Sequence, residues 1–200
     1  MKRGIIVFVE GETEEEIYNI FIRYIHSIAN NGKFSTDKLL VRNLKGISNF
    51  RSKAIRVFSK EILPQNPNFE FDIFLCYDTD VFDFSQKPPV DWKEVEKDLK
   101  NLGAKKVIHI KAKHSIEDWI LNDFDGICRY LKISSTTNNI SGSGFKKLES
   151  LFKKSNKVYI KGSKAKGFIE SLSIQKIMCT NCTQVKNLCR LLGVTCSKQK

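Results

Sequence analysis

The sequence has no apolar run near the roughly 20 residues that a membrane-spanning helix needs. The longest apolar run near the N-terminus is Ile5–Val9, which is too short for the core of a signal peptide. Acidic residues follow it instead of a small-residue cleavage site. We therefore expect a cytoplasmic protein that does not enter a membrane. Its 200 residues, 41% of them hydrophobic, suffice to bury a globular core.

Histidine is scarce, and the three histidines form no catalytic pattern. Four of the six cysteines lie near the C-terminus: Cys179, Cys182, Cys189 and Cys196. A disulfide framework is not expected without a secretory signal. The four cysteines could hold zinc. However, the apolar residues around them recur at helical spacing, and Gly-rich turns between them are missing, so the favoured interpretation is a helix packed on the core.

Negative charge is nearly missing from the last part of the chain. Residues 145–200 hold 13 of the 34 Lys and Arg residues but 2 of the 22 Asp and Glu residues, and the net charge of the whole chain is +12. A basic segment of this kind predicts a polyanionic partner, and DNA or RNA is the natural one. A surface that only improves solubility is the alternative. We expect nucleic acid to contact Lys161, Lys164 and Lys166.

Short apolar runs alternate with helical patterns along the chain. Strands are expected at residues 4–9, 39–41, 71–77, 107–110 and 157–160. Helices are expected to follow at residues 13–28, 50–62, 92–102, 115–123, 145–152 and 174–192. This alternation predicts an α/β fold with a mainly parallel sheet flanked by helices. We assign residues 1–133 to a catalytic core and residues 134–200 to a basic α/β extension packed on the same sheet.

Two helix starts carry a capping signature. Thr13 is followed three residues later by Glu16, and Ser115 is followed by Asp118. In a capping box, each of the two side chains accepts a hydrogen bond from the backbone N–H of the other residue. We expect both helices to begin in this way.

Acidic residues gather where the expected strands end. Glu10 follows the first strand, Asp78 and Asp80 follow the third, Glu117 lies shortly after the fourth, and Glu14 lies in the first helical turn. The carboxyl ends of parallel strands meet at one edge of a sheet. Carboxylates packed together repel each other unless a cation neutralises them, and oxygen ligands suit Mg²⁺. We predict that these five acids form a Mg²⁺ site in which Mn²⁺ can substitute.

Each acid also has a structural explanation. Glu14 and Glu117 could complement helix dipoles, and Asp78 and Asp80 could shape a turn. A structural explanation fits Glu10 least well, because Glu10 directly follows a continuous apolar run. The acids follow three different strands and are expected at the same edge of the sheet, and this coincidence favours a metal site.

The motif Val9-Glu10-Gly11-x-Thr13-Glu14, together with Asp78-Thr79-Asp80, resembles the Toprim domain of topoisomerases, bacterial primases and several nucleases. It is most similar to the overcoming-lysogenisation-defect (OLD) nucleases and related phage-defence Toprim proteins. The segment 115–119 is similar to a further motif of that subgroup. The resemblance covers residues 4–123.

The resemblance implies a Rossmann-like fold and Mg²⁺-dependent chemistry on nucleic-acid phosphodiesters. It implies that Glu10, Asp78 and Asp80 hold the metal, and that Glu14 and Glu117 assist. It also implies a late lysine that helps neutralise the transition state, and we assign this function to Lys164.

The chain lacks features of several Toprim proteins. Residues 141–147 contain Gly and Lys but not the full phosphate-loop spacing, so an ATPase would have to be a separate partner. The chain has no room for the nucleophilic-tyrosine domain of a topoisomerase or the template-handling domains of a primase. A stand-alone nuclease is the leading interpretation, and the resemblance implies a role in phage defence.

Two alternatives come from other classes of protein. A phosphoacceptor receiver-like signalling domain also places acids, a Ser or Thr and a Lys at strand ends, and Glu10, Asp78, Ser115 and Lys161 fit that outline loosely. A non-catalytic nucleic-acid-binding subunit of a larger complex would explain the basic segment alone. The full acidic set favours the nuclease over both.

Overall fold

The computed structural model describes residues 1–29, 36–80, 90–135 and 140–195, without the side chains of residues 163 and 164. Four strands form one sheet: β1 (Lys2–Val9), β2 (Lys38–Asn43), β3 (Phe69–Asp78) and β4 (Lys106–Ala112). All neighbouring pairs are parallel, in the order β2-β1-β3-β4. The expectation of an α/β fold with a parallel sheet flanked by helices is confirmed.

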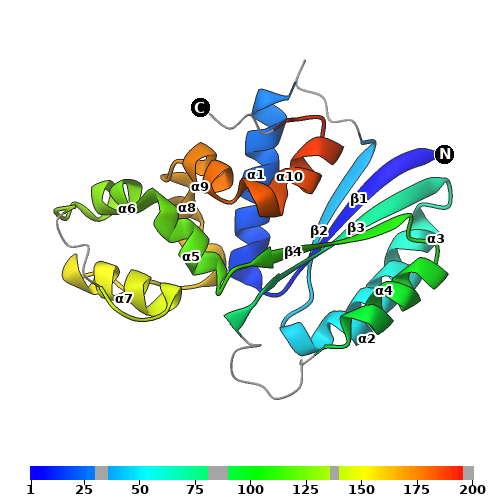
Figure 1. The fold of residues 1–200 in the computed structure, drawn as a ribbon, viewed down its shortest axis with the longest axis horizontal. Coiled ribbons are helices and arrows are strands. Elements are labelled where there is room, and N and C mark those ends of the chain that lie inside the picture. The colour runs from blue at the N-terminus through cyan, green and yellow to red at the C-terminus, as the bar shows by residue number, and fades with distance from the viewer. Residues whose placement is uncertain (30–35, 81–89, 136–139, 196–200) are drawn as a thin grey trace.

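Helices cover both faces of this sheet (Figure 1). The link from β1 to β2 contains α1 (Glu12–Ile28), and the link from β3 to β4 contains α4 (Trp92–Asn101). Four consecutive helical segments lead toward β3: η2 (Ile47–Asn49), α2 (Phe50–Arg56), the π-helix η3 (Val57–Ile62) and α3 (Leu63–Gln65).

Alternate side chains of β1 enter two separate cores. Ile5, Val7 and Val9 pack on the α1 face, whereas Ile6 and Phe8 pack on the face covered by α2 and α4. All five side chains are at most 1% exposed. A strand buried on both faces reads as a continuous apolar run, which is why the first strand could be recognised from sequence.

The rest of the chain lies on the α1 side of the sheet (Figure 1). It forms α5 (Ile116–Ile120), η5 (Leu121–Asp123), α6 (Phe124–Leu131), α7 (Gly144–Lys154), η6 (Gly162–Ala165), α8 (Lys166–Glu170), α9 (Ile174–Thr180) and α10 (Cys182–Leu191). Segments η6, α8 and α9 contact α1, and α10 contacts β4. Their apolar residues join the same core as α1.

The expected strand at residues 157–160 is wrong. These residues are irregular: Tyr159 is buried, whereas Val158 and Ile160 are exposed. Tyr159 packs on Phe152 and Phe168, with ring centroids 5.2 and 6.2 Å apart. An extended segment lying on helices therefore produces the same apolar pattern as a strand in a sheet.

The expected final helix is divided into α9 and α10 at Asn181, whose backbone departs from helical geometry. Within the described ranges, no helix is both long and apolar enough to cross a membrane.

Candidate functional site

The predicted acids lie at the point where the sheet topology reverses. From β1 the chain moves to β2 on one side, and it later returns to β3 on the other side of β1. Ligands of open α/β sheets bind outside the carboxyl ends of the strands at such a point. Glu10 directly follows β1, and Asp78 is the last residue of β3. The two residues therefore flank this position.

Backbone hydrogen bonds connect the turn after β3 to the segment after β4. The Thr79 N–H donates to the carbonyl oxygens of Ala112 (3.1 Å) and His114 (2.9 Å), and the Asp80 N–H donates to His114 (2.9 Å). In return, the His114 N–H donates to Thr79 Oγ1 at 2.9 Å. His114 has a left-handed backbone, with φ of 63°. This arrangement holds the start of α5 beside Asp78 and Asp80.

Glu117 is fixed in the first turn of α5. Ser115 and Asp118 form the expected capping box, with Asp118 Oδ2 accepting from the Ser115 N–H (3.2 Å) and Oγ (2.9 Å). Glu117 is 0% exposed. Its Oε1 lies 2.8 Å from Lys161 Nζ. Among the described residues, neither Glu117 oxygen has a well-aligned hydrogen bond, so this contact is an ion pair.

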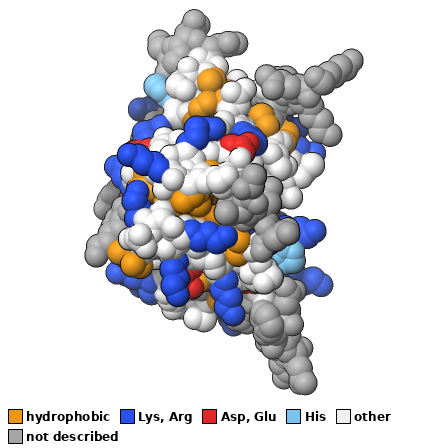
Figure 2. Space-filling model, turned by 90° about the vertical axis from the view of Figure 1, so that its left-hand side faces the viewer, with side chains coloured by type: hydrophobic (Ala, Val, Ile, Leu, Met, Phe, Trp, Pro, Cys, Tyr) orange, Lys and Arg blue, Asp and Glu red, His pale blue; other side chains and the backbone are white. Residues whose placement is uncertain are grey.

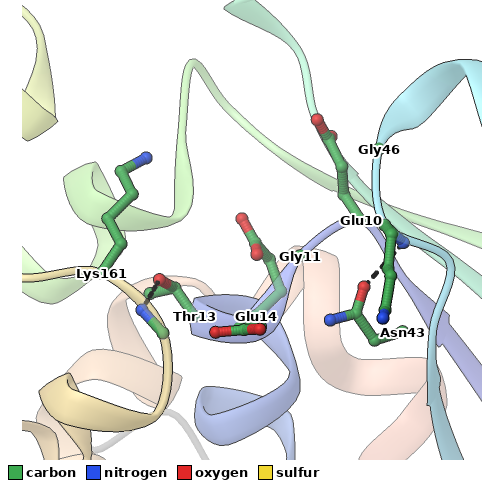
Figure 3. Close-up of a pocket in the computed structure, with 10 residues that line it drawn as sticks. Glu10, Gly11, Thr13, Glu14, Asn43, Gly46 and Lys161 are labelled. Carbon is green, nitrogen blue, oxygen red and sulfur yellow. Dashed lines mark hydrogen bonds between the residues drawn. The ribbon is translucent and has the colours of Figure 1, made fainter.

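The expected capping function of Thr13 is wrong. Helix α1 begins at Glu12 after Gly11, without a side-chain cap. Thr13 Oγ1 instead accepts a hydrogen bond of 2.8 Å from the Gly162 N–H (Figure 3). Gly162 has φ of +80°, and a Cβ there would lie 2.4 Å from Glu12 Oε2, so this position requires glycine. The contact fastens the segment containing Lys161 to the start of α1.

Burial and mutual repulsion hold protons on these acids. The pKa of Asp78 rises to about 9, first because of burial and then because of the charges of Glu14, Glu117, Glu10 and Asp80. Burial and the Glu14 charge raise the pKa of Glu10 to about 7, although a hydrogen bond from the Asp78 backbone opposes this. Burial also raises the pKa of Glu14.

Lys161 is the nearby positive charge. Burial alone would lower its pKa, but the contact with Glu117 and that residue's charge outweigh this effect and raise the pKa. Lys161 therefore remains charged and offsets part of the repulsion among the acids.

The donor set suits a hard divalent cation. Glu10 Oε2, Asp78 Oδ1 and both Glu117 oxygens are buried without a hydrogen-bond partner among the described residues. Among the described residues, no group of three or more His, Cys, Asp or Glu side chains is placed so that it could hold one metal ion. Mg²⁺ commonly takes one or two carboxylates and completes its shell with water and substrate phosphates. The residues fit such a site by chemistry and burial.

A cavity of about 510 Å³ opens at this edge of the sheet (Figure 3). Glu10, Glu14 and Lys161 line it, whereas Asp78, Asp80 and Glu117 do not. The lining also contains Asn43 and Lys45, which were not among the residues predicted from sequence. Asn43 is the last residue of β2 and Lys45 lies two residues later, so both residues lie at the same edge of the sheet as the acids. That position is the sequence signal that could have identified them.

The structure places the three lysines that were predicted to contact nucleic acid in different environments. Lys161 reaches the acids. Lys166 is exposed at the start of α8. The side chain of Lys164, our predicted assisting lysine, lies outside the described part of the chain, so its role stays a prediction.

The C-terminal cysteines do not form a metal site in the described part of the chain. Cys179 is exposed, Cys182 is half-buried and Cys189 is buried, all as free thiols. Burial raises the pKa of Cys189 to about 11, which keeps it protonated. Cys196 lies outside the described residues.

Comparison with known proteins finds no matching family model, no matching curated protein and no matching solved structure. The geometry of the site and the properties of its residues are therefore what support a function.

Replacing Thr13 by Val is expected to lower the free energy of unfolding by about 1–2 kcal/mol, because the buried Gly162 N–H loses its acceptor. Urea titration measures this loss. The matched control is Thr183→Val, since Thr183 is exposed on α10. Equal stability of Thr13→Val and Thr183→Val would contradict the anchoring function of Thr13.

Proposed function

We propose that the protein is a Mg²⁺-dependent nuclease of the Toprim type that hydrolyses nucleic-acid phosphodiesters. The observation that supports this most is the gathering of buried acids with raised pKa values at the switch point between β1 and β3. Structural acids are normally paired. Here Asp78 and Glu10 each have a buried oxygen without a partner among the described residues.

Each residue would have a defined task. Glu10, Asp78 and Asp80 would hold the cation, with Glu14 and Glu117 assisting. When bound, the cation would activate a water and stabilise negative charge on the phosphate. Lys161 and Lys45, which both line the cavity, would position the phosphate and offset its charge.

The proposed partner is DNA or RNA, and the basic surface supports it. Figure 2 views the molecule from the side of α6 and α7 and shows many Lys and Arg side chains with few acids between them. Lys161 Nζ lies 4.8 Å from the ring centroid of Phe145 on α7 and 2.8 Å from Glu117 Oε1, so Lys161 lies between α7 and the acids. A substrate held on the basic face would therefore pass the cavity.

The direct test is incubation of plasmid, linear duplex DNA, single-stranded DNA and tRNA with the protein and Mg²⁺ or Mn²⁺. We expect cleavage of at least one substrate, and none in EDTA. Binding without any cleavage would favour the nucleic-acid-binding subunit, or an enzyme that needs a separate ATPase partner. Phosphate uptake from a small phosphodonor would favour the receiver-like domain. Protection of cells from phage, lost together with cleavage, would support a defence role.

Lys161→Gln is expected to slow cleavage about a hundredfold, because it removes the charge beside Glu117 and the phosphate. Lys164→Gln is the comparison variant, with the same chemical change three residues away. Initial rates at saturating Mg²⁺ measure both. A larger loss in Lys164→Gln would support the prediction that Lys164 is the assisting lysine.

A further inference from the structure

A second cavity, of about 350 Å³, opens between α6, α7, α8 and the irregular segment 157–160. Its wall contains four aromatic rings: Tyr130, Phe152, Tyr159 and Phe168. Ring centroids are 5.1 Å apart for Tyr130 and Phe168, and 5.0 Å apart for Phe152 and Phe168. This volume is near the lower limit of small-molecule pockets, about 300 Å³, and suits one planar ring system.

The mouth of this aromatic cavity is both apolar and cationic. Val158 is 76% exposed and Ile160 is 46% exposed, which is unusual for large apolar side chains. Lys157 Nζ lies 4.8 Å above the ring of Tyr130. Further exposed cations at the ends of the surrounding helices include Arg129 and Lys132 at the end of α6, Lys153 and Lys154 at the end of α7, and Lys166 at the start of α8. A ligand that joins a planar ring to negative charge, as a nucleotide does, complements this mouth.

The aromatic cavity lies next to the cavity of the acids, and Phe145 lies between the two. Lys161 Nζ lies 4.8 Å from the ring centroid of Phe145, and Phe145 lies 5.8 Å from Tyr159. The Tyr159 hydroxyl is buried without a hydrogen-bond partner among the described residues. Burial raises the pKa of Tyr159 most, and the charges of Glu117 and Glu14 raise this pKa further. Residues 157–160 therefore line the aromatic cavity, and the next residue, Lys161, lines the cavity that contains Glu10 and Glu14.

We propose that the aromatic cavity binds one unpaired nucleobase of the substrate strand, beside the phosphate held at the acidic site. This inference rests on the proposed function and specifies its substrate class. A base inside a duplex cannot enter such a cavity unless it leaves the stack. The substrate is therefore single-stranded or locally unpaired nucleic acid.

The test measures binding without cleavage, in EDTA. The probes are two fluorescent single strands of about a dozen units, one of thymidines and one of abasic sites with the same phosphates. We expect the wild type to bind the thymidine strand about tenfold or more tightly than the abasic strand. Tyr130→Leu should remove this preference and leave abasic binding unchanged. Tyr24→Leu, a partly buried tyrosine on α1, is the control and should keep the preference.

A second measurement uses the unaltered protein. A strand containing 5-iodouracil is crosslinked by light, and we expect the crosslinked peptide to contain Tyr130, Tyr159 or Phe168. Equal affinity for both strands, or crosslinks only outside the aromatic cavity, would overturn the proposal even if the protein cleaves DNA. A base preference without any cleavage would support the nucleobase site and count against a stand-alone nuclease.

Discussion

Replacing Asp78 by Asn is expected to reduce metal-dependent cleavage by at least about a thousandfold, with binding of nucleic acid in EDTA unchanged. Asp78 is 9% exposed, and its Oδ1 has no partner among the described residues. The amide has the same shape as the carboxyl group but cannot supply a negative charge to a cation. The fold is therefore preserved while the metal site is lost. Initial rates over a range of Mg²⁺ concentrations measure the effect.

Asp123→Asn is the matched control, because Asp123 is also a buried acid but has a structural task. It caps α6 by accepting from the Gly126 N–H, and it accepts from the Ser173 N–H at 2.7 Å. We expect this variant to lose stability but to keep its cleavage rate per folded molecule. Wild-type cleavage by Asp78→Asn would exclude the carboxylate site, whatever the stability of either variant.

The sheet and its acidic edge could be predicted from sequence because the information is local. β1 contains the apolar run Ile5–Val9 and β3 contains the apolar run 73–77, and a parallel sheet places the last residues of both strands at the same edge. The positions of Glu10 and Asp78 follow directly. Ser115 and Asp118 lie three residues apart, so their capping box was also readable.

The lysine of the site could not be predicted in this way. Lys161 is positioned by the hydrogen bond between Gly162 and Thr13, which are 149 residues apart in sequence. No periodicity marks such a contact. A strand assigned to residues 157–160 also gave the wrong backbone for the segment before Lys161, so it could not show which of the three lysines faces the acids. Lys45 lies two residues past the end of β2, and neither an apolar period nor an acidic motif marks it in the sequence.

The stability of the metal-free protein is expected to fall as the pH rises from about 5 to about 8. The folded protein keeps a proton on Asp78 up to about pH 9 and on Glu10 up to about pH 7, whereas the unfolded chain loses these protons near pH 4. Between these limits the folded state binds more protons than the unfolded state. Raising the pH therefore favours unfolding, by up to about 1 kcal/mol per pH unit for each proton retained.

Mg²⁺ is expected to reverse this trend, because a bound cation replaces the protons and favours the charged carboxylates. Urea midpoints at the two pH values, in EDTA and in Mg²⁺, measure the effect. Asp78→Asn should flatten the pH dependence in EDTA and should gain less from Mg²⁺, since an amide has no proton to exchange for the cation. Stability that rises with pH in EDTA, or an unchanged slope in Asp78→Asn, would show that these acids are not held protonated in the folded protein.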